Sequence, residues 1–249
     1  MIAAAGRKNV TEMTNESRVR VLISGGFSGA YEQLLSDFER TSGISVTTGS
    51  GASQGTGPQT IAAQLARGVP ADVVILSREG LGELMAANRI VAGTDVDLAR
   101  VPLGVAVRAG TAKPDVSTVE AFKQVVLGAR IVAMPASTSG IWLLTELFPR
   151  LGIAGKVDTK AAPRGSDATR MVAAGEVDLA VMPVSEILDA PGVDYAGSIA
   201  LEIQFLQVFS AAIVAGSRAV AAAKRLIEFL ASARARAAIS KSGMEPIER

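Results

Sequence analysis

Three short polar segments, residues 24–28, 50–59 and 137–140, hold most of the side chains that could bind a small ligand. Backbone N–H groups at a helix start, together with hydroxyl groups, form a site for a carboxylate or an oxyanion. Glycine lets the backbone approach such a ligand closely. Helix capping, a tight turn and a mobile surface loop are the structural alternatives. The predicted ligand contacts are Ser24, Gly25, Gly26, Phe27, Ser28, Ser50, Ser53, Gln54, Thr56, Ser137, Thr138, Ser139 and Gly140.

Two arginines extend this prediction. Arg78 follows the apolar run 73–76, and Arg164 lies in the polar segment 163–167. A guanidinium group binds a carboxylate through two parallel hydrogen bonds. We therefore include both side chains among the predicted ligand contacts, with solvated surface charge as the alternative for each.

The chain of 249 residues contains neither histidine nor cysteine. This absence excludes a Ser-His-Asp triad, thiolate nucleophiles and metal centres held by imidazole or thiolate. A proton transfer would have to use a carboxylate, an amine, a phenol or a hydroxyl group. The candidates are Glu186, Glu202, Lys160, Tyr31 and hydroxyl groups polarised by their neighbours. The sequence does not rank them, so the catalytic residue stays unassigned. We expect no cofactor and no bound metal.

The composition is that of a packed globular protein, with 49% hydrophobic and 20% charged residues. The 25 basic and 24 acidic residues give a net charge of +1, which provides no field to attract nucleic acid or an anionic membrane. The uncharged stretch 203–217 is shorter than the ~20 residues that a membrane span needs. The expected partner is a small anion, without nucleic acid and without membrane insertion.

Strand and helix patterns alternate along the chain, which predicts an α/β fold. In the first half, apolar runs predict strands at 18–23, 44–48 and 73–76, with helices at 28–42, 58–67 and 79–88. In the second half, the patterns predict strands at 131–134, 157–161 and 178–182, with helices at 117–127, 141–150 and 168–174. A strand at 204–215, a helix at 217–233 and a helical stretch at 234–240 complete the chain.

The two halves contain a weak internal repeat. Residues 64–76 and 171–182 share one plan: a helix, a terminating glycine, an aspartate and a buried strand. Two similar halves predict two small α/β lobes with a cleft between them. The C-terminal block has no counterpart before the second half, so we expect it to return to the first lobe. The predicted lobes are residues 17–103 with 208–249 and residues 104–207, preceded by a flexible N-terminus at 1–16.

The order of these elements resembles the periplasmic molybdate-binding protein family. The resemblance is carried by the segment from Arg18 to Gly43, by the motif Gly68, Pro70, Ala71, Asp72, Val73 and Val74, and by the C-terminal residues 225–246. It covers residues 18–246. It implies a two-lobed, type II periplasmic-binding-protein-like fold. Each lobe would be a mixed or parallel sheet flanked by helices, and the ligand would lie in the cleft.

A more specific similarity links the chain to the branch of this family that includes aconitate isomerase. It is carried by SGGFSGAY, GPQTIAAQLARGVPADVVIL, VDLARVPLGVAVRAGTAKPDVSTVEAFK and STSGIWLLTELFPRLGI. The similarity implies an isomerase acting on a small unsaturated di- or tricarboxylate, by a proton shift or a cis–trans isomerisation. The alternative is a substrate-binding protein that delivers a small anion, a molybdate-like oxyanion or an organic acid, to an ABC permease after export.

The N-terminal residues bear on location. The apolar run 2–5 is shorter than the ~7–15 residues that a secretory signal needs. We therefore expect the protein in the cytoplasm, or in the periplasm if a leader has been removed.

Overall fold

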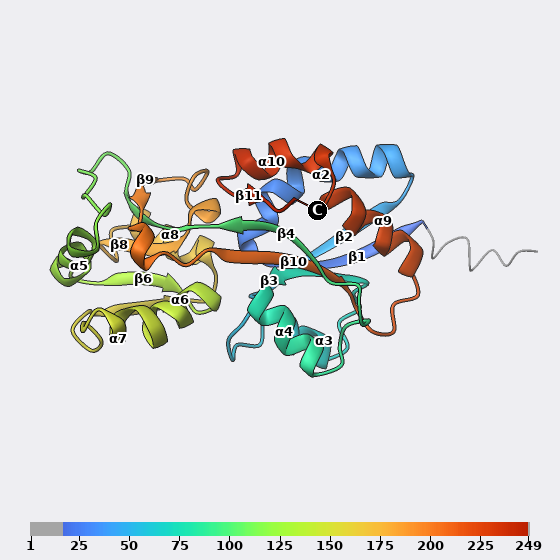
Figure 1. Ribbon diagram of the computed structural model, residues 1–249, viewed down its shortest axis with the longest axis horizontal. Helices are drawn as coiled ribbons and strands as arrows, with labels where there is room; N and C mark the ends of the chain where they lie inside the picture. Colours follow the sequence, from blue (N-terminus) through green and yellow to red (C-terminus); the bar gives the residue numbers. More distant parts are fainter. Residues whose placement is uncertain (1–16, 249) are drawn as a thin grey trace, which may run out of the picture.

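Two β-sheets organise the computed structural model, which describes residues 17–248. The six-stranded sheet has the order β11-β4-β10-β3-β1-β2, and the five-stranded sheet has the order β7-β6-β8-β5-β9. Each sheet and its helices form one group of elements, and the two groups lie side by side along the long axis (Figure 1). We call the group around the six-stranded sheet the first lobe and the other group the second lobe.

The first lobe contains a mixed sheet. β1 pairs in parallel with β2 and β3, whereas β10 is antiparallel to β3 and β4, and β11 is antiparallel to β4. The strands are β1 (Arg18–Ile23), β2 (Ser45–Ser50), β3 (Val73–Ser77), β4 (Val96–Val101), β10 (Gln207–Ile213) and β11 (Glu245–Pro246). The helices are α2 (Gly25–Ser42), α3 (Ile61–Ala66), α4 (Arg78–Ala86), α9 (Val220–Leu230) and α10 (Arg236–Lys241), with a 3-10 turn η4 (Ala233–Ala235).

The second lobe repeats this plan. β6 pairs in parallel with β7 and β8, and β5 is antiparallel to β8 and β9. The strands are β5 (Leu103–Arg108), β6 (Val132–Pro135), β7 (Thr159–Ala162), β8 (Leu179–Pro183) and β9 (Val193–Ser198). The helices are α5 (Val119–Gly128), α6 (Thr138–Trp142), the π-helical turn η1 (Leu143–Leu147), α7 (Phe148–Arg150) and α8 (Gly165–Ala173), with 3-10 turns η2 (Val184–Glu186) and η3 (Leu201–Ile203).

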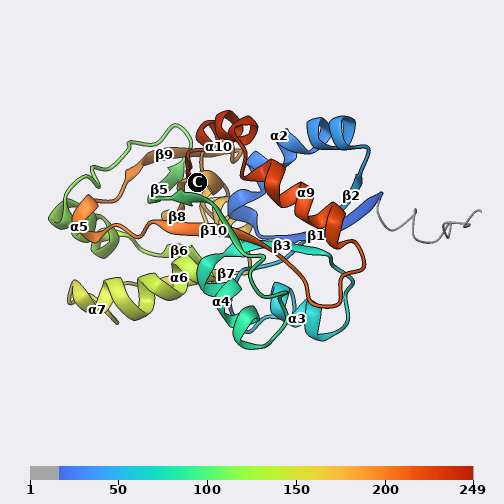
Figure 2. The same cartoon turned by 45° about the vertical axis from the view of Figure 1, so that its right-hand side comes forward.

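Each sheet lies between two layers of helices. In β3, Val73 and Ile75 pack into the core that α2 and α9 cover, whereas Val74 and Leu76 pack into the core under α3 and α4. Successive strand side chains point to opposite faces, so a wholly apolar strand fills both cores at once. Figure 2 shows α2 and α9 on one side of the first lobe and α3 and α4 on the other. Among residues 17–248, no helix is long and apolar enough to span a membrane.

Two connections join the lobes. Pro102 links β4 to β5, and the segment containing η3 links β9 to β10. The amide of Gln204 ties them together: its Oε1 accepts from the backbone N–H of Leu103 at 2.7 Å, and its Nε2 donates to the Leu103 carbonyl at 3.1 Å. The expected lobe limits, 17–103 with 208–249 and 104–207, stay a prediction. The flexible segment expected at 1–16 lies outside the described residues.

Three helices begin earlier than the sequence predicts. α2 starts at Gly25 instead of residue 28, α6 at Thr138 instead of residue 141, and α8 at Gly165 instead of residue 168. The prediction treated these glycine and serine residues as loops because both disfavour helix interiors. It was wrong because the N–H groups of a first helical turn have no intrahelical partner, so small polar residues are tolerated there.

Other predicted boundaries also move. The helix expected from Pro58 begins at Ile61, because the Thr60 hydroxyl accepts from the N–H of Ala63 at 3.1 Å and caps it. Ser217 does not begin a helix that runs to residue 233; its hydroxyl binds Asp72, and α9 spans Val220–Leu230. The prediction also missed β4, β5, β9 and β11. β4 and β9 have no continuous apolar run.

The repeated aspartates have the same structural use in both lobes. Asp72, just before β3, accepts from the backbone N–H and the Nε of Arg20, both at 2.9 Å. Asp178, just before β8, accepts from the backbone N–H of Arg130 at 2.5 Å and from its Nη2 at 3.2 Å. Each aspartate therefore holds the start of a neighbouring parallel strand. Only the first carboxylate is sequestered, because the Asp72 side chain is 2% exposed and that of Asp178 is 40% exposed.

We expect Asp72→Ala to lower the free energy of unfolding by about 2–3 kcal/mol, because it removes charge-assisted hydrogen bonds from a buried carboxylate. Asp178→Ala, the matched control in the other lobe, should lower the free energy of unfolding by less than about 1 kcal/mol.

Burial favours a higher pKa of Asp72, but the hydrogen bonds from Arg20 and Ser217 outweigh this effect and hold the pKa below its usual value. The Asp72 contribution is therefore present at neutral pH and is lost in acid. Urea denaturation at several pH values measures both effects, and equal losses for the two variants would contradict the prediction.

Candidate functional site

A cavity of about 40 Å³, here called the inner cavity, lies where the two lobes meet. The carboxyl ends of β1, β2, β6, β7 and β8 all lead to it, as in other α/β sheets that bind ligands at this edge. Its lining residues are Ser24, Gly25, Gly26, Gly51, Ala52, Ser53, Pro135, Ser137, Thr138, Ser139, Pro163, Arg164, Gly165, Pro183, Glu186, Gln207 and Phe209.

A larger outer cavity of about 770 Å³ adjoins the inner one. The two share Gly25, Gly51, Arg164 and Glu186 as lining residues. The outer cavity adds hydroxyl and charged side chains from both lobes: Ser28, Glu32, Thr48, Ser50, Ser166, Thr169, Arg170, Ser185, Asp189 and Ser242. A ligand bound in the inner cavity therefore has a polar space into which it can extend.

Three helices begin at the inner cavity without a capping side chain. Ser24, Ser137 and Arg164 are the N-cap residues of α2, α6 and α8, and none of their side chains accepts from the first turn. In contrast, Thr60, Ser77 and Thr118 cap α3, α4 and α5. An uncapped first turn at a cavity presents N–H groups and the positive end of the helix dipole, and both favour a bound anion.

Two buried polar atoms of the inner cavity have no hydrogen-bond partner among the described residues. They are the hydroxyl oxygen of Ser24 and the Oε1 atom of Gln207, in residues that are 5% and 4% exposed. A buried polar atom without a partner costs about 1–3 kcal/mol. Both residues line the inner cavity. The Ser24 hydroxyl can donate to a bound anion, whereas Oε1 of Gln207 only accepts and needs a donor such as water.

Hydrogen bonds join the lobes beside the cavity. The hydroxyl groups of Ser77 and Thr138 share a hydrogen bond of 2.7 Å, and the backbone N–H of Gln54 donates to Oγ of Ser137 at 3.1 Å. Ser53 supports the first contact, since its hydroxyl accepts from the N–H of Ser77 at 2.9 Å. The segments that the sequence assigned to the site in each half are thus in direct contact.

Glu186, at the end of η2, projects its carboxylate between two glycines. A Cβ atom at Gly25 would lie 2.6 Å from Oε2 of Glu186, and one at Gly165 would lie 2.0 Å from it. A Cβ atom at either position would therefore force the carboxylate of Glu186 to move. Among residues 17–248, no hydrogen bond or ion pair holds this carboxylate, and burial raises the pKa of Glu186 to about 7.

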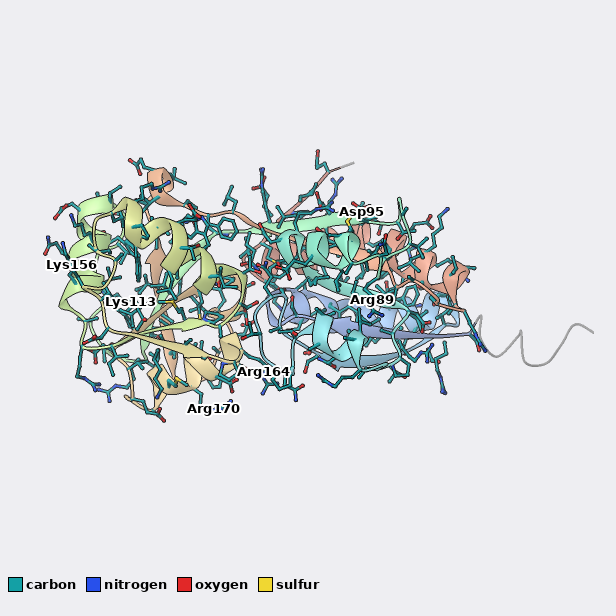
Figure 3. The ribbon with its side chains drawn as sticks, turned by 90° about the horizontal axis from the view of Figure 1, so that it is seen from below. Arg89, Asp95, Lys113, Lys156, Arg164 and Arg170 are labelled. Atoms are coloured by element: carbon teal, nitrogen blue, oxygen red, sulfur yellow. The ribbon has the colours of Figure 1, made fainter. Side chains whose placement is uncertain are left out.

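Arg164 supplies the positive side chain of the site. It lines both cavities, and Figure 3 shows it where the two lobes face each other. Its Nε lies 3.4 Å from Oδ2 of Asp167, and its side chain is 52% exposed. Arg170, one turn further along α8, pairs with the same carboxylate at 2.6 Å. The guanidinium of Arg164 is therefore only weakly held and can turn toward a ligand.

The structure brings most of the predicted contacts together. Ser24, Gly25, Gly26, Ser53, Ser137, Thr138, Ser139 and Arg164 line the inner cavity, and Ser28 and Ser50 line the outer one. Four other predicted contacts lie elsewhere. Phe27 is fully buried in the core against Phe209, and Gly140 packs against the carbonyl of Pro135. The Nε2 of Gln54 donates to Glu83, and Thr56 is exposed on its loop.

Arg78 has a structural role instead of the predicted ligand contact. Its Nε donates to Asp97 and its Nη1 to Asp95, both at 2.8 Å. It lines neither cavity. The two aspartates, on β4 and just before it, bind its guanidinium. They are distant in sequence, so the local pattern around residue 78 did not indicate them.

Of the acid–base candidates, the structure brings to the inner cavity Glu186 and hydroxyl groups, those of Ser24, Ser53, Ser137, Thr138 and Ser139. Glu202 is exposed in η3, and Lys160 pairs with Glu176 at 3.1 Å. Tyr31 is buried and hydrogen-bonded to Thr48 at 2.8 Å, and burial raises its pKa to about 12. Among residues 17–248, no three acidic side chains lie close enough together to hold a metal ion.

Sequence reasoning missed Gly165 and Gln207. Gly165 had a signal, because it follows a predicted strand in the same way as Gly25 does. Gln207 had a weaker one: it is the polar first residue of a buried strand, β10. Its position at the cavity follows from the antiparallel pairing of β10 with β3, which places the start of β10 beside the end of β3.

Residues 19–245 match the family described as bacterial extracellular solute-binding protein. A protein from Pseudomonas sp. named aconitate isomerase is 36% identical over 228 residues, which cover 91% of this chain and 87% of that protein.

Solved structures match the same length of chain. The periplasmic molybdate-binding protein of Azotobacter vinelandii has a TM-score of 0.69 and 21% identity, covering 91% of this chain and 98% of that one. The sulfate-binding protein SubI of Mycobacterium tuberculosis has a TM-score of 0.74 and 20% identity, covering 93% and 87%. At these identities the similarity concerns the fold alone, and it confirms the predicted two-lobed α/β architecture.

The raised pKa of Glu186 has a consequence for stability. The folded chain holds a proton on Glu186 up to about pH 7, whereas the unfolded chain releases it near pH 4.5. Rising pH between these values should therefore destabilise the parent protein by up to about 1.4 kcal/mol per pH unit relative to Glu186→Gln. Urea denaturation at pH 5 and pH 8 measures the difference. Glu202→Gln, an exposed control, should follow the parent; a Glu186→Gln variant that does so as well would contradict the assignment.

Proposed function

This chain belongs to the family of bacterial extracellular solute-binding proteins. We propose that it is an isomerase of a small unsaturated di- or tricarboxylate. The observation that carries the proposal is the 36% identity, over 91% of the chain, with the protein named aconitate isomerase. Because the match covers 91% of the chain, it spans both lobes. The proposed substrate class is therefore alkene acids such as aconitate.

The geometry of the site supports an anionic substrate. The uncapped starts of α2, α6 and α8 present N–H groups to one carboxylate, and Ser24 and Ser139 add hydroxyl groups. Arg164 stands at the boundary of the two cavities, where a second carboxylate would reach it. Charge-assisted hydrogen bonds of this kind contribute roughly 1.5–3 kcal/mol each.

The reaction sets two chemical requirements. Moving a double bond in an alkene acid removes a proton from the carbon at one end of the allylic unit and returns a proton at the other end. This needs a group that takes and gives the proton, and donors that stabilise the enolate charge that develops. The N–H groups at the helix starts fit the second requirement.

Closure of the lobes is part of the proposal. The lobes are joined by two connections that Gln204 ties together, and hydrogen bonds from Ser77 to Thr138 and from Gln54 to Ser137 cross beside the cavity. We infer that substrate enters when these contacts open and is enclosed when they reform, by a hinge motion. Enclosure removes water from the reacting atoms.

A second candidate function is a substrate-binding protein of an ABC importer for a small anion. The family match over residues 19–245 favours it, since the same cavity serves a receptor without any proton transfer. This function requires export to the periplasm and a permease as partner. The isomerase has neither requirement.

Incubating the protein with trans-aconitate and following cis-aconitate by chromatography tests the proposal. We expect conversion, together with binding of tricarboxylates in calorimetry. Molybdate, tungstate and sulfate are the comparison ligands. A protein that binds one of these anions tightly but converts neither aconitate nor related alkene acids would be a receptor, and the isomerase proposal would fall.

Ser139 tests the position of the substrate. It is 2% exposed and lines the inner cavity, so Ser139→Ala should weaken anion binding about tenfold, equivalent to about 1.4 kcal/mol. Ser139→Asp should weaken it further, because it places like charge beside the ligand. Thr145→Asp, on the exposed side of the same helical segment, is the control for added charge. Unchanged affinity in a folded Ser139→Asp variant would place the anion elsewhere.

A further inference from the structure

Resting on the proposed isomerase function, we propose that Glu186 is the catalytic residue that carries the proton between the two carbon atoms of the substrate. The sequence left this group unassigned among Glu186, Glu202, Lys160, Tyr31 and polarised hydroxyl groups. The arrangement of the inner cavity distinguishes them, by position first and by chemistry second.

The position of the side chains in the inner cavity singles out one carboxylate. Among the described residues that line the inner cavity, the side chains with an acidic or basic group are Arg164 and Glu186. A guanidinium group keeps its proton in proteins and cannot act as a base at neutral pH. The remaining lining residues are hydroxyl, amide, apolar or glycine residues. Glu186 is therefore the proton acceptor that a ligand in this cavity can reach.

The two glycines aim Glu186 at the substrate. Gly25 is the first residue of α2 and Gly165 is the first residue of α8, so the carboxylate lies at the starts of two helices from different lobes. These are the same uncapped turns that are placed to bind a substrate carboxylate. A substrate held there has its reacting carbons within reach of Glu186.

The absence of partners keeps the carboxylate reactive. Other carboxylates of this chain, such as Asp72 and Asp178, are held by arginine and by backbone N–H groups. No such contact holds Glu186 among residues 17–248, and burial places its pKa near neutrality. Both protonation states are then accessible at neutral pH, which suits a group that must both take and return a proton.

Substrate binding strengthens this base. A substrate carboxylate at the starts of α2 and α8 places a negative charge beside Glu186. Like charge raises the proton affinity of a carboxylate, so Glu186 takes a proton more readily in the complex than in the free protein. Arg164 limits this effect by compensating part of the added charge.

The proposed step balances without a co-reactant. The Glu186 carboxylate accepts the proton from the methylene carbon of the alkene acid, and the electron pair of the broken C–H bond forms a new C=C bond. The electrons of the old double bond move into the carboxylate at the far end, giving a dienolate. The neutral Glu186 then donates the proton to the carbon at that far end, which restores its carboxylate and leaves the double bond shifted.

The test compares Glu186→Gln with Glu202→Gln. Glutamine keeps the size of the side chain but cannot accept the proton, so kcat for aconitate conversion should fall about 10²–10⁴-fold. KM and the affinity measured by calorimetry should change by less than about threefold, or about 0.7 kcal/mol. Glu202 is exposed and outside both cavities, so its variant should keep the activity of the parent.

Isotope exchange gives a readout that a structural role would not change. In deuterium oxide, the parent protein should introduce deuterium into aconitate recovered during turnover, as measured by mass spectrometry. Glu186→Gln should lose this exchange while still binding aconitate. Glu186→Asp, whose carboxylate is one methylene further back, should retain slow exchange and turnover.

The pH profile adds a further readout. We expect kcat/KM of the parent to rise with pH through a limb near neutrality, as the base form of Glu186 is populated. The charged groups that face it are Arg164 and Arg170 from α8, Glu32 from α2, and Asp189. The proposal is supported if this rise of kcat/KM with pH is lost in Glu186→Gln and kept in Glu186→Asp.

The outcomes separate two failures. If the parent converts aconitate and folded Glu186→Gln converts it at a similar rate, the assignment of Glu186 is overturned and the isomerase function stands. If the parent binds carboxylates but converts no alkene acid, the isomerase function falls, and the assignment falls with it. Should Glu186→Gln fail to fold by circular dichroism, the Glu186→Asp variant decides: unchanged kcat and exchange would overturn the assignment.

Discussion

The site depends on one close contact, in which the carboxylate of Glu186 fits between two glycines from different lobes. A Cβ atom at Gly25 or Gly165 would lie 2.6 Å or 2.0 Å from Oε2 of Glu186 and would displace the carboxylate from its present position. The absence of a Cβ atom therefore lets the starts of α2 and α8 approach one acidic group. This contact explains why the two lobes meet at a small, polar cavity, and why a group with a pKa near neutrality lies where an anion would bind.

The topology of the two sheets explains why the helix starts meet there. β1, β2, β6, β7 and β8 all direct their carboxyl ends to the interface, so the segments that follow them emerge at one place. A helix that begins immediately after such a strand directs free N–H groups toward that place. This arrangement suits a receptor and an enzyme equally well, since one fold supports many functions. What favours an enzyme here is the titratable group added to the anion site.

Satisfied and unsatisfied polar groups are separated along each lobe. At the far ends of the strands, Asp72 binds Arg20 and Asp178 binds Arg130, so strand starts are fixed by complete hydrogen-bond sets. At the interface, Ser24 and Gln207 leave buried oxygens without partners, and three helix starts lack caps. The stabilising contacts thus lie away from the cavity, and the groups left open for a ligand lie in it.

The sequence by itself determined the α/β alternation, the repeated helix–glycine–aspartate–strand plan and the polar segments at the ends of strands. These follow from local periodicity and from residues that are neighbours in the chain. Only the tertiary structure decided that Gly25, Thr138 and Gly165 begin helices, because a first turn facing a cavity escapes the usual cost of glycine and serine. It also decided that Arg78 binds Asp95 and Asp97, and that Gln207 reaches the site through antiparallel pairing of β10. The structure distinguished Glu186 from the other candidates for the same reason. Gly25 and Gly165, the two glycines beside its carboxylate, are far from it in sequence, and only the packing of two lobes brings them together.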